Sequence, residues 1–108
     1  MTDKKLIEIA KNVSEKAYAP YSGFKVGAAI LCKSGKVFSG CNVENASYGL
    51  TNCSERTAVF KAVSEGETGF EKIVIYTDTD ILFTPCGACR QVLAEFNPDI
   101  EVLIVSRK

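Results

Sequence analysis

Three cysteines and one glutamate lie where two helices are expected to begin. Cys53 and Glu55 are two residues apart in the stretch "TNCSERTAVFKAV", and Cys86 and Cys89 are three residues apart in "TPCGACRQ". Side chains three residues apart lie on the same side of a helix, and a helix N-terminus stabilises thiolates through its dipole and its free N–H groups. Three thiolate ligands leave zinc with one open coordination position, which is the pattern of a catalytic zinc site.

Glu55 can serve such a site without binding the metal. A carboxylate on the same first turn can project toward the open position, accept a proton from the water there and return it to a substrate. Two alternatives remain. Asn52 and Glu55 could form a capping box, and Cys86 and Cys89 could form a redox C-x-x-C pair, although the thioredoxin-like order of elements that normally accompanies this motif is not present.

Arg56 follows Glu55 directly in the sequence. A Zn²⁺ ion with three thiolates carries one formal negative charge, so it acidifies bound water less than a site with neutral ligands does. Arg56 and the two helix N-termini can offset this charge. We therefore predict that the Arg56 guanidinium hydrogen-bonds the thiolates; the alternative is an ordinary solvated helix arginine.

Composition narrows the classes of function. The 108 residues are 46% hydrophobic and 24% charged, which fits one compact domain spanning residues 1–108. The net charge is zero and there is no basic run, which argues against a nucleic-acid or membrane-surface partner. The sequence shows no apolar run of membrane-spanning length and no signal-peptide core, so we expect a cytoplasmic protein. It has five cysteines and no histidine, which favours metal or thiol chemistry without histidine ligands or bases.

The elements that must position these residues follow from periodicity and turn residues. The expected helices cover residues 3–17, 53–65 and 84–97, and the expected strands cover 24–32, 37–44, 72–77 and 100–105. The first two strands read as a β-hairpin joined by "KSGK". The later strand–helix–strand order predicts a right-handed parallel crossover. The order predicts an α/β fold of two or three layers with a mixed sheet.

Together, the motifs resemble those of a known enzyme family. "CSE" and "PCGAC" match the C-x-E…P-C-x-x-C signature of zinc nucleoside and nucleobase deaminases. The blocks "YAPYSGFKVGAA", "GCNVENASYGLTNCSERTA" and "PCGACRQ" are similar to those of cytidine deaminase, in its small homotetrameric branch with all-cysteine metal ligands. The resemblance runs from about Ala17 to the end of the chain. It implies a three-layer α/β/α sandwich in which a β-hairpin precedes a βαβ crossover.

The implied reaction is the hydrolytic deamination of cytidine and 2′-deoxycytidine to uridine and 2′-deoxyuridine, with release of ammonia, in pyrimidine salvage. One Zn²⁺ per chain would be held by Cys53, Cys86 and Cys89, with Glu55 moving the protons. Two rivals remain: a deaminase of a related cytosine nucleoside or antibiotic, and an inactive structural zinc module. A polynucleotide deaminase is disfavoured by the neutral charge.

The resemblance also implies which residues bind the nucleoside. Phe24 would stack on the pyrimidine; its alternative is a buried strand residue. Asn42 and Glu44 would bind the ribose 3′-hydroxyl, since an amide and a carboxylate can satisfy it as donor and acceptor. The alternative for this pair is turn chemistry.

Three further positions complete the implied site. Ala46 and Tyr48 would reach the nucleoside of a neighbouring subunit in the homotetramer. Ser54 stands where the family usually carries alanine, and its contact with substrate would come from the backbone. The family normally continues past "VLIVSRK" with another strand and an aromatic residue over a neighbouring site, so we expect this chain to lack that segment.

Overall fold

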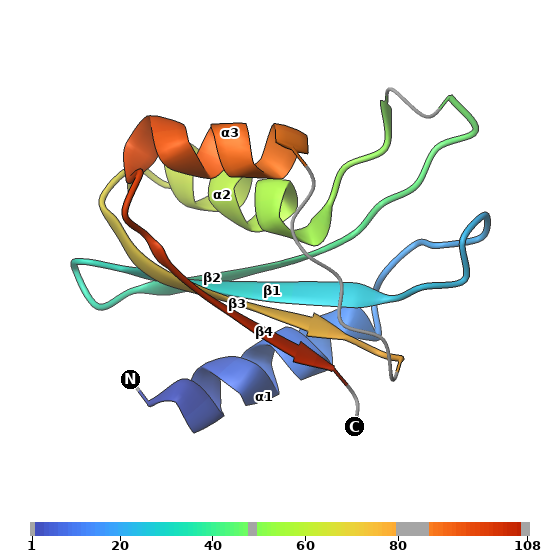
Figure 1. Cartoon of the computed structure of the whole chain (residues 1–108), viewed down its shortest axis with the longest axis horizontal. Helices are drawn as coiled ribbons and strands as arrows, with labels where there is room; N and C mark the ends of the chain where they lie inside the picture. Colours follow the sequence, from blue (N-terminus) through green and yellow to red (C-terminus); the bar gives the residue numbers. More distant parts are fainter. Residues whose placement is uncertain (1, 48–49, 80–86, 107–108) are drawn as a thin grey trace.

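A four-stranded sheet with helices on both faces forms the centre of the computed structural model (Figure 1), which describes residues 2–47, 50–79 and 87–106. The elements are α1 (Asp3–Ser14), β1 (Val26–Cys32), β2 (Val37–Cys41), α2 (Ser54–Ser64), β3 (Phe70–Thr77), α3 (Gly87–Phe96) and β4 (Glu101–Ser106). This order confirms the predicted fold class, and the helices on the two faces make the three-layer alternative the correct one.

The sheet is mixed, with strand order β2-β1-β3-β4. β1 pairs antiparallel with both β2 and β3, so the hairpin is present as expected. β3 and β4 are parallel neighbours, and α3 connects them. This connection is the predicted crossover, and it brings the start of α3 to the end of the sheet where β3 finishes.

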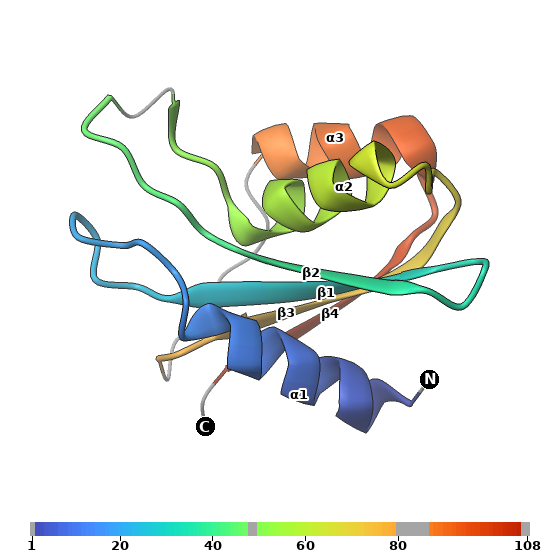
Figure 2. The same cartoon turned by 180° about the vertical axis from the view of Figure 1, so that it is seen from behind.

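Alternation along the strands divides the core between the two faces of the sheet. Ala29 and Leu31 of β1 pack with Val74 of β3 against α1. On the opposite face, Ile30 of β1 and Ile75 of β3 pack against α2 and α3. Figure 2 shows α1 alone below the sheet and α2 and α3 side by side above it. None of the described helices is long and apolar enough to cross a membrane.

The largest corrections to the predicted boundaries concern the ends of α1 and β2, whereas β1 begins at Val26 instead of residue 24 and β3 at Phe70 instead of residue 72. The first helix was expected to reach residue 17, but α1 ends at Ser14 and the chain continues in tighter turns, in which the N–H of Ala17 donates to the carbonyl of Ser14 at 3.1 Å. β2 ends at Cys41 instead of residue 44, because Val43 leaves the sheet and forms bridges with Tyr18 and Asn52. The expected helix start at residues 84–86 lies outside the described residues.

Two glycines let a helix backbone approach a strand. A Cβ at Gly27 of β1 would lie 1.9 Å from the carbonyl oxygen of Ala10 in α1. A Cβ at Gly40 of β2 would lie 2.4 Å from the backbone nitrogen of Ala58 and 2.9 Å from the carbonyl oxygen of Ser54, both in α2. These neighbours are backbone atoms and cannot swing aside, so both helices depend on the missing side chain for their position.

Gly27→Ala is therefore expected to destabilise the fold by at least about 3 kcal/mol, since the overlap forces α1 away from the sheet. Gly69→Ala is the matched control, because a Cβ there makes only ordinary contact, 3.6 Å from the Lys33 side chain. Urea denaturation of both variants measures the difference. Equal stability of the two variants would mean that the α1–β1 packing is looser than its geometry indicates.

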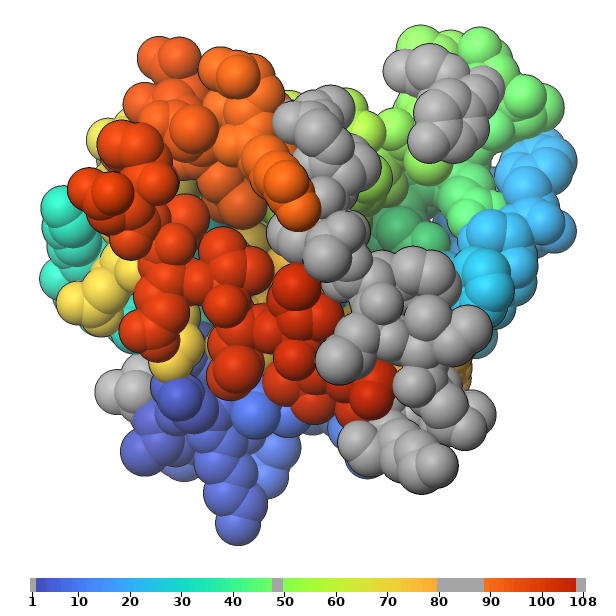
Figure 3. Space-filling view, viewed as in Figure 1, coloured from blue at the N-terminus to red at the C-terminus, as the bar shows by residue number. Residues whose placement is uncertain are grey.

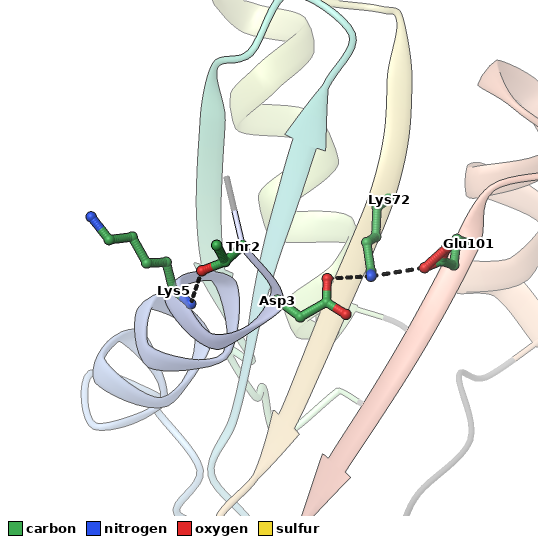
Figure 4. Close-up of polar contacts among 5 residues, drawn as sticks. All are labelled: Thr2, Asp3, Lys5, Lys72 and Glu101. Atoms are coloured by element: carbon green, nitrogen blue, oxygen red, sulfur yellow. Dashed lines mark hydrogen bonds and ion pairs between the residues drawn. The ribbon is translucent and has the colours of Figure 1, made fainter.

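A charged cluster joins α1, β3 and β4 at the end of the sheet where β3 begins (Figure 4). The Lys72 ammonium at the start of β3 lies 2.5 Å from an Asp3 oxygen in α1 and 2.8 Å from a Glu101 oxygen in β4. Beside it, Thr2 caps α1 by accepting the N–H of Lys5 at 3.2 Å. The two carboxylates raise the pKa of Lys72. These contacts tie the start of α1 to the sheet far from the residues with candidate chemistry.

Candidate active site

The candidate residues gather at one end of the molecule. α2 and α3 lie side by side with their N-terminal ends toward the same side (Figures 1 and 2). The loops before β1 and after β2 project at this same end, and the space-filling view shows them in contact at its right edge, in light blue and green (Figure 3). The topology thus brings three stretches that are distant in sequence to one place: the loop before β1, the loop after β2 with the start of α2, and the start of α3.

The start of α2 positions Cys53 and Glu55. Cys53 is the N-cap residue, with extended backbone and no hydrogen bond from its side chain to the helix, so its thiol is not used for capping. Its carbonyl accepts from both the N–H and the hydroxyl of Thr57, each at 3.1 Å. The capping-box alternative is wrong, because the N-cap is Cys53, while Asn52 pairs through its backbone with Val43.

Glu55 is a buried carboxylate on the first turn of α2, with only 5% of its surface exposed. The hydroxyl of Ser54, also buried, donates to Glu55 Oε1 at 2.6 Å. From the sequence only the Ser54 backbone was expected to have a role, so this side-chain contact is an addition. The residue type carried the relevant information, because an alanine could not donate a hydrogen bond to the neighbouring carboxylate.

Arg56 joins the thiols of both helices. Its Nη2 donates to the carbonyl of Thr51 at 3.0 Å and to Cys53 Sγ at 3.7 Å. The hydrogen bond to Cys53 raises the pKa of Arg56, burial opposes this, and the charges of Cys53 and Cys89 raise it further. Arg56 is therefore not a solvated helix arginine. Its position shows that one guanidinium interacts with a thiol from α2 and with a thiol from α3.

The donor set suits a zinc ion. Cys53 is half-buried at the start of α2, and Cys89 is fully buried on the first turn of α3. Cys86, the third expected ligand, lies outside the described residues, and within residues 2–47, 50–79 and 87–106 no three acidic, histidine or cysteine side chains form a metal site. Arg56 Nε is buried without a hydrogen-bond partner among the described atoms. Two thiols beside a partly buried cation are the chemistry that a thiolate metal centre needs.

Asn42 binds the backbone on both sides of residue 25. Its Oδ1 accepts the N–H of Val26 at 2.9 Å, and its Nδ2 donates to the carbonyl of Phe24 at 2.8 Å. The side chain is 8% exposed and joins the end of β2 to the start of β1. One N–H of the amide is not used in these bonds, so it remains as a donor for a ligand.

Glu44 holds the preceding turn. Its Oε1 accepts the N–H groups of Tyr21 at 2.9 Å and Ser22 at 3.0 Å, and its Oε2 accepts the Ser22 hydroxyl. The Ser22 hydroxyl lowers the pKa of Glu44 most, burial raises it, and the two N–H groups lower it further. The ionised Glu44 carboxylate should therefore stabilise the turn at any pH above the ordinary glutamate pKa. This stabilisation should be lost as the pH falls through the lowered pKa of Glu44.

The remaining expected residues lie near this turn or outside the description. Phe24 precedes β1 and is 39% exposed, so the alternative of a buried strand residue is wrong. Ala46 is exposed in the loop after β2. Tyr48 lies outside the described residues, and the roles of Ala46 and Tyr48 toward a neighbouring subunit stay predictions. Sequence analysis missed Ser22, although a serine directly before a glycine in a turn-rich stretch often bonds the local backbone.

Comparison with known proteins agrees with this arrangement. The family model described as "Cytidine and deoxycytidylate deaminase zinc-binding region" matches residues 1–106. A cytidine deaminase of Sporosarcina psychrophila is 50% identical over 109 residues, covering 100% of this chain and 80% of the relative. One from Halalkalibacterium halodurans is 56% identical over 98 residues, covering 91% of this chain and 74% of the relative.

Solved structures and a relative with a different name extend the comparison. The crystal structure of cytidine deaminase from Burkholderia pseudomallei superimposes with a TM-score of 0.94 at 53% identity, covering 100% of this chain and 87% of that one. Blasticidin-S deaminase of Bacillus cereus is 36% identical over 112 residues, covering 94% of this chain and 78% of the relative. With a family model that spans nearly the whole sequence and a matching fold, the chain belongs to the cytidine and deoxycytidylate deaminase family and is a hydrolase that removes amino groups.

Proposed function

We propose that this protein, as a single domain over residues 1–108, hydrolyses cytidine and 2′-deoxycytidine to uridine and 2′-deoxyuridine and releases ammonia. The observation that carries the proposal is the buried Glu55 carboxylate beside Cys53, with Arg56 joining Cys53 to Cys89. A buried carboxylate is costly unless it is paired or used in chemistry. Its place on the first turn of α2, next to the expected metal ligands, supports a role in proton transfer.

Cys53, Cys86 and Cys89 would hold one Zn²⁺ per chain. When bound, the ion supplies a Lewis acid that activates water for hydrolysis. Arg56 would reduce the negative charge of the thiolates through its contact with Cys53. Metal analysis together with the loss of cytidine absorbance in purified protein tests the proposal; protein with full zinc that leaves both nucleosides intact would contradict it.

The other residues would bind and orient the nucleoside. Glu55 would take a proton from water and deliver protons to N3 and to the leaving amine of the base, with its Oε1 held by the Ser54 hydroxyl. Phe24, which is partly exposed just before β1, would stack on the pyrimidine ring. Asn42 and Glu44 would bind the ribose 3′-hydroxyl with the donor and acceptor positions that their backbone contacts leave open.

Glu44→Ala is expected to raise the KM for cytidine by roughly 5- to 100-fold and also to lower kcat, because a bound sugar hydroxyl loses its acceptor. Wild-type enzyme should show a similar penalty with 3′-deoxycytidine, which lacks that hydroxyl, and cytosine should be a poor substrate. With 3′-deoxycytidine, which has no 3′-hydroxyl for Glu44 to bind, Glu44→Ala should have nearly the same kcat/KM as the wild-type enzyme. Steady-state kinetics measures these ratios. If Glu44→Ala lowers kcat/KM equally for cytidine and 3′-deoxycytidine, Glu44 only supports the turn.

A second candidate function is deamination of a cytosine-containing antibiotic. It is favoured by the 36% identity to a protein named Blasticidin-S deaminase over most of this chain. The candidates differ in what occupies the sugar subsite, so parallel assays with cytidine and blasticidin S distinguish them. The higher identity to proteins named cytidine deaminase, 50% and 56%, supports a simple cytosine nucleoside as the first candidate substrate.

The setting proposed for this activity is pyrimidine salvage in the cytoplasm by a homotetramer. Exposed apolar side chains support an oligomer: Leu50 is 70% exposed in the loop before α2, and Phe60 is 46% exposed on α2. Ala46 and Tyr48 would then contribute to the site of the next subunit. Sedimentation of the active protein measures the assembly directly.

A further inference from the structure

We propose that Ser22 is a positioning residue that sets both the sugar-binding carboxylate and the base-stacking ring. The inference rests on the proposed function, because it concerns how Glu44 and Phe24 meet a nucleoside. It starts from three contacts of one serine. Its N–H donates to Glu44 Oε1 at 3.0 Å, its hydroxyl donates to Glu44 Oε2, and its Oγ accepts the N–H of Phe24 at 3.1 Å.

These contacts fix the direction of the Glu44 carboxylate. A glutamate at a partly exposed position would otherwise sample many rotamers. Ser22 contacts both oxygens, one through its N–H and one through its hydroxyl, so the carboxylate cannot rotate about its last bond without losing a hydrogen bond. Tyr21 adds a second N–H to Oε1 at 2.9 Å. The hydroxyl of Ser22 is the only one of these three donors that belongs to a side chain, so Ser22→Ala removes it and keeps both backbone N–H groups.

The count of acceptor positions then locates the ligand. An ionised carboxylate offers about four lone-pair positions, two on each oxygen. The N–H groups of Tyr21 and Ser22 fill both on Oε1, and the Ser22 hydroxyl fills one on Oε2. Within the described part of the chain, the position left for a sugar hydroxyl is therefore on Oε2, next to the hydroxyl of Ser22.

The surroundings of Glu44 leave room for such a ligand. A cavity of about 260 Å³ is lined by Tyr21, Ser22, Glu44, Asn45 and Thr51. The Ser22–Glu44 pair therefore borders open space between the loop before β1 and the loop after β2. A ribose ring that enters this cavity meets a carboxylate whose orientation is already set, so less conformational entropy is lost on binding.

The same serine controls the path of the chain to Phe24. Gly23 between them has φ +76°, a conformation that side chains rarely adopt, and its N–H donates to the carbonyl of Ala19 at 3.0 Å. This turn brings the N–H of Phe24 onto Ser22 Oγ, while Asn42 Nδ2 holds the carbonyl of Phe24. The backbone of Phe24 is thus fixed on both sides, once through Ser22.

The test compares Ser22→Ala, Ser22→Thr and Ser34→Ala. Ser34 is the matched control, since its hydroxyl also donates to a glutamate, Glu67 at 3.0 Å, in an exposed turn at the other end of β1. Ser22→Ala is expected to raise the KM for cytidine about tenfold, while kcat changes less than about threefold. Ser22→Thr keeps the hydroxyl and should stay within about twofold of wild type, as should Ser34→Ala.

The decisive measurement is the preference for cytidine over 3′-deoxycytidine. If Ser22 acts through Glu44, Ser22→Ala reduces this preference, because the Glu44 carboxylate that accepts the 3′-hydroxyl is no longer held in one orientation. A loss that is equal for both nucleosides, or a threonine variant no better than alanine, overturns the proposal. Failure of the proposed function looks different: wild-type protein would turn over neither nucleoside. In that case, amide hydrogen exchange still measures how firmly the turn is held. An unchanged exchange rate of the Phe24 amide in Ser22→Ala would overturn the positioning role.

Discussion

Glu55→Gln is expected to leave the fold and the zinc content intact while kcat falls by about 10²–10⁴-fold. Glutamine has nearly the same shape, and its amide oxygen can still accept the Ser54 hydroxyl that now donates to Glu55 Oε1 at 2.6 Å. The amide cannot accept a proton from water and return it to the base. Because one residue would perform several proton transfers, the loss should lie toward the upper end of this range.

Ser54→Ala is the control for this experiment, since it removes the partner of Glu55 without removing the carboxylate. We expect its kcat to fall by no more than about tenfold, in line with the loss of one hydrogen bond. Stopped assays with cytidine and zinc analysis of each variant give the comparison. A glutamine variant that unfolds, with normal activity per folded molecule, would show that Glu55 serves only the start of α2.

The fold was predictable because helical spacing, apolar or alternating strand runs and turn residues agree along most of the chain. β3 illustrates this, since its buried residues alternate between the two faces and its expected range, 72–77, lies within the observed Phe70–Thr77. The end of α1 was not predictable from periodicity, because Ala17 continues the helical spacing. What stops the helix is a tertiary contact: Tyr18 donates its N–H to the carbonyl of Asn42 at 3.1 Å.

The site was predictable only in part. Cys53, Glu55 and Cys89 could be assigned to the first turns of two helices because a helix start fixes the direction of its first residues. The side-chain contacts of Asn42 and Glu44 with the backbone could not be foreseen, because they join residues 16–23 positions apart on the two sides of the β1–β2 hairpin, where each strand gives way to irregular chain. Sequence analysis treated substrate binding and turn chemistry as alternatives for this pair. The geometry allows both, since each side chain keeps a polar position open while it holds the turn.

Cys89→Ser is expected to remove zinc and to reduce kcat for cytidine by about 10³-fold or more, because a Lewis acid contributes several kcal/mol to such a reaction. Cys89 is fully buried on the first turn of α3, and its charge acts on Arg56 together with that of Cys53. Serine has nearly the same size, but it is a poor ligand for zinc at neutral pH. The two helix starts would then lose their shared ion.

Because a zinc ion held by Cys53 and Cys89 would tie α2 to α3, chelation of wild-type protein should lower Tm by about 10 °C or more, whereas the Cys89→Ser variant should not respond to chelator. Cys41→Ser is the matched control: Cys41 is a half-buried free thiol on β2, outside the helix starts, and its replacement should keep one zinc per chain. Metal analysis and thermal denaturation with and without chelator measure both effects. Full zinc content in Cys89→Ser would place the metal on other residues and would leave Arg56 as a partner of the thiols alone.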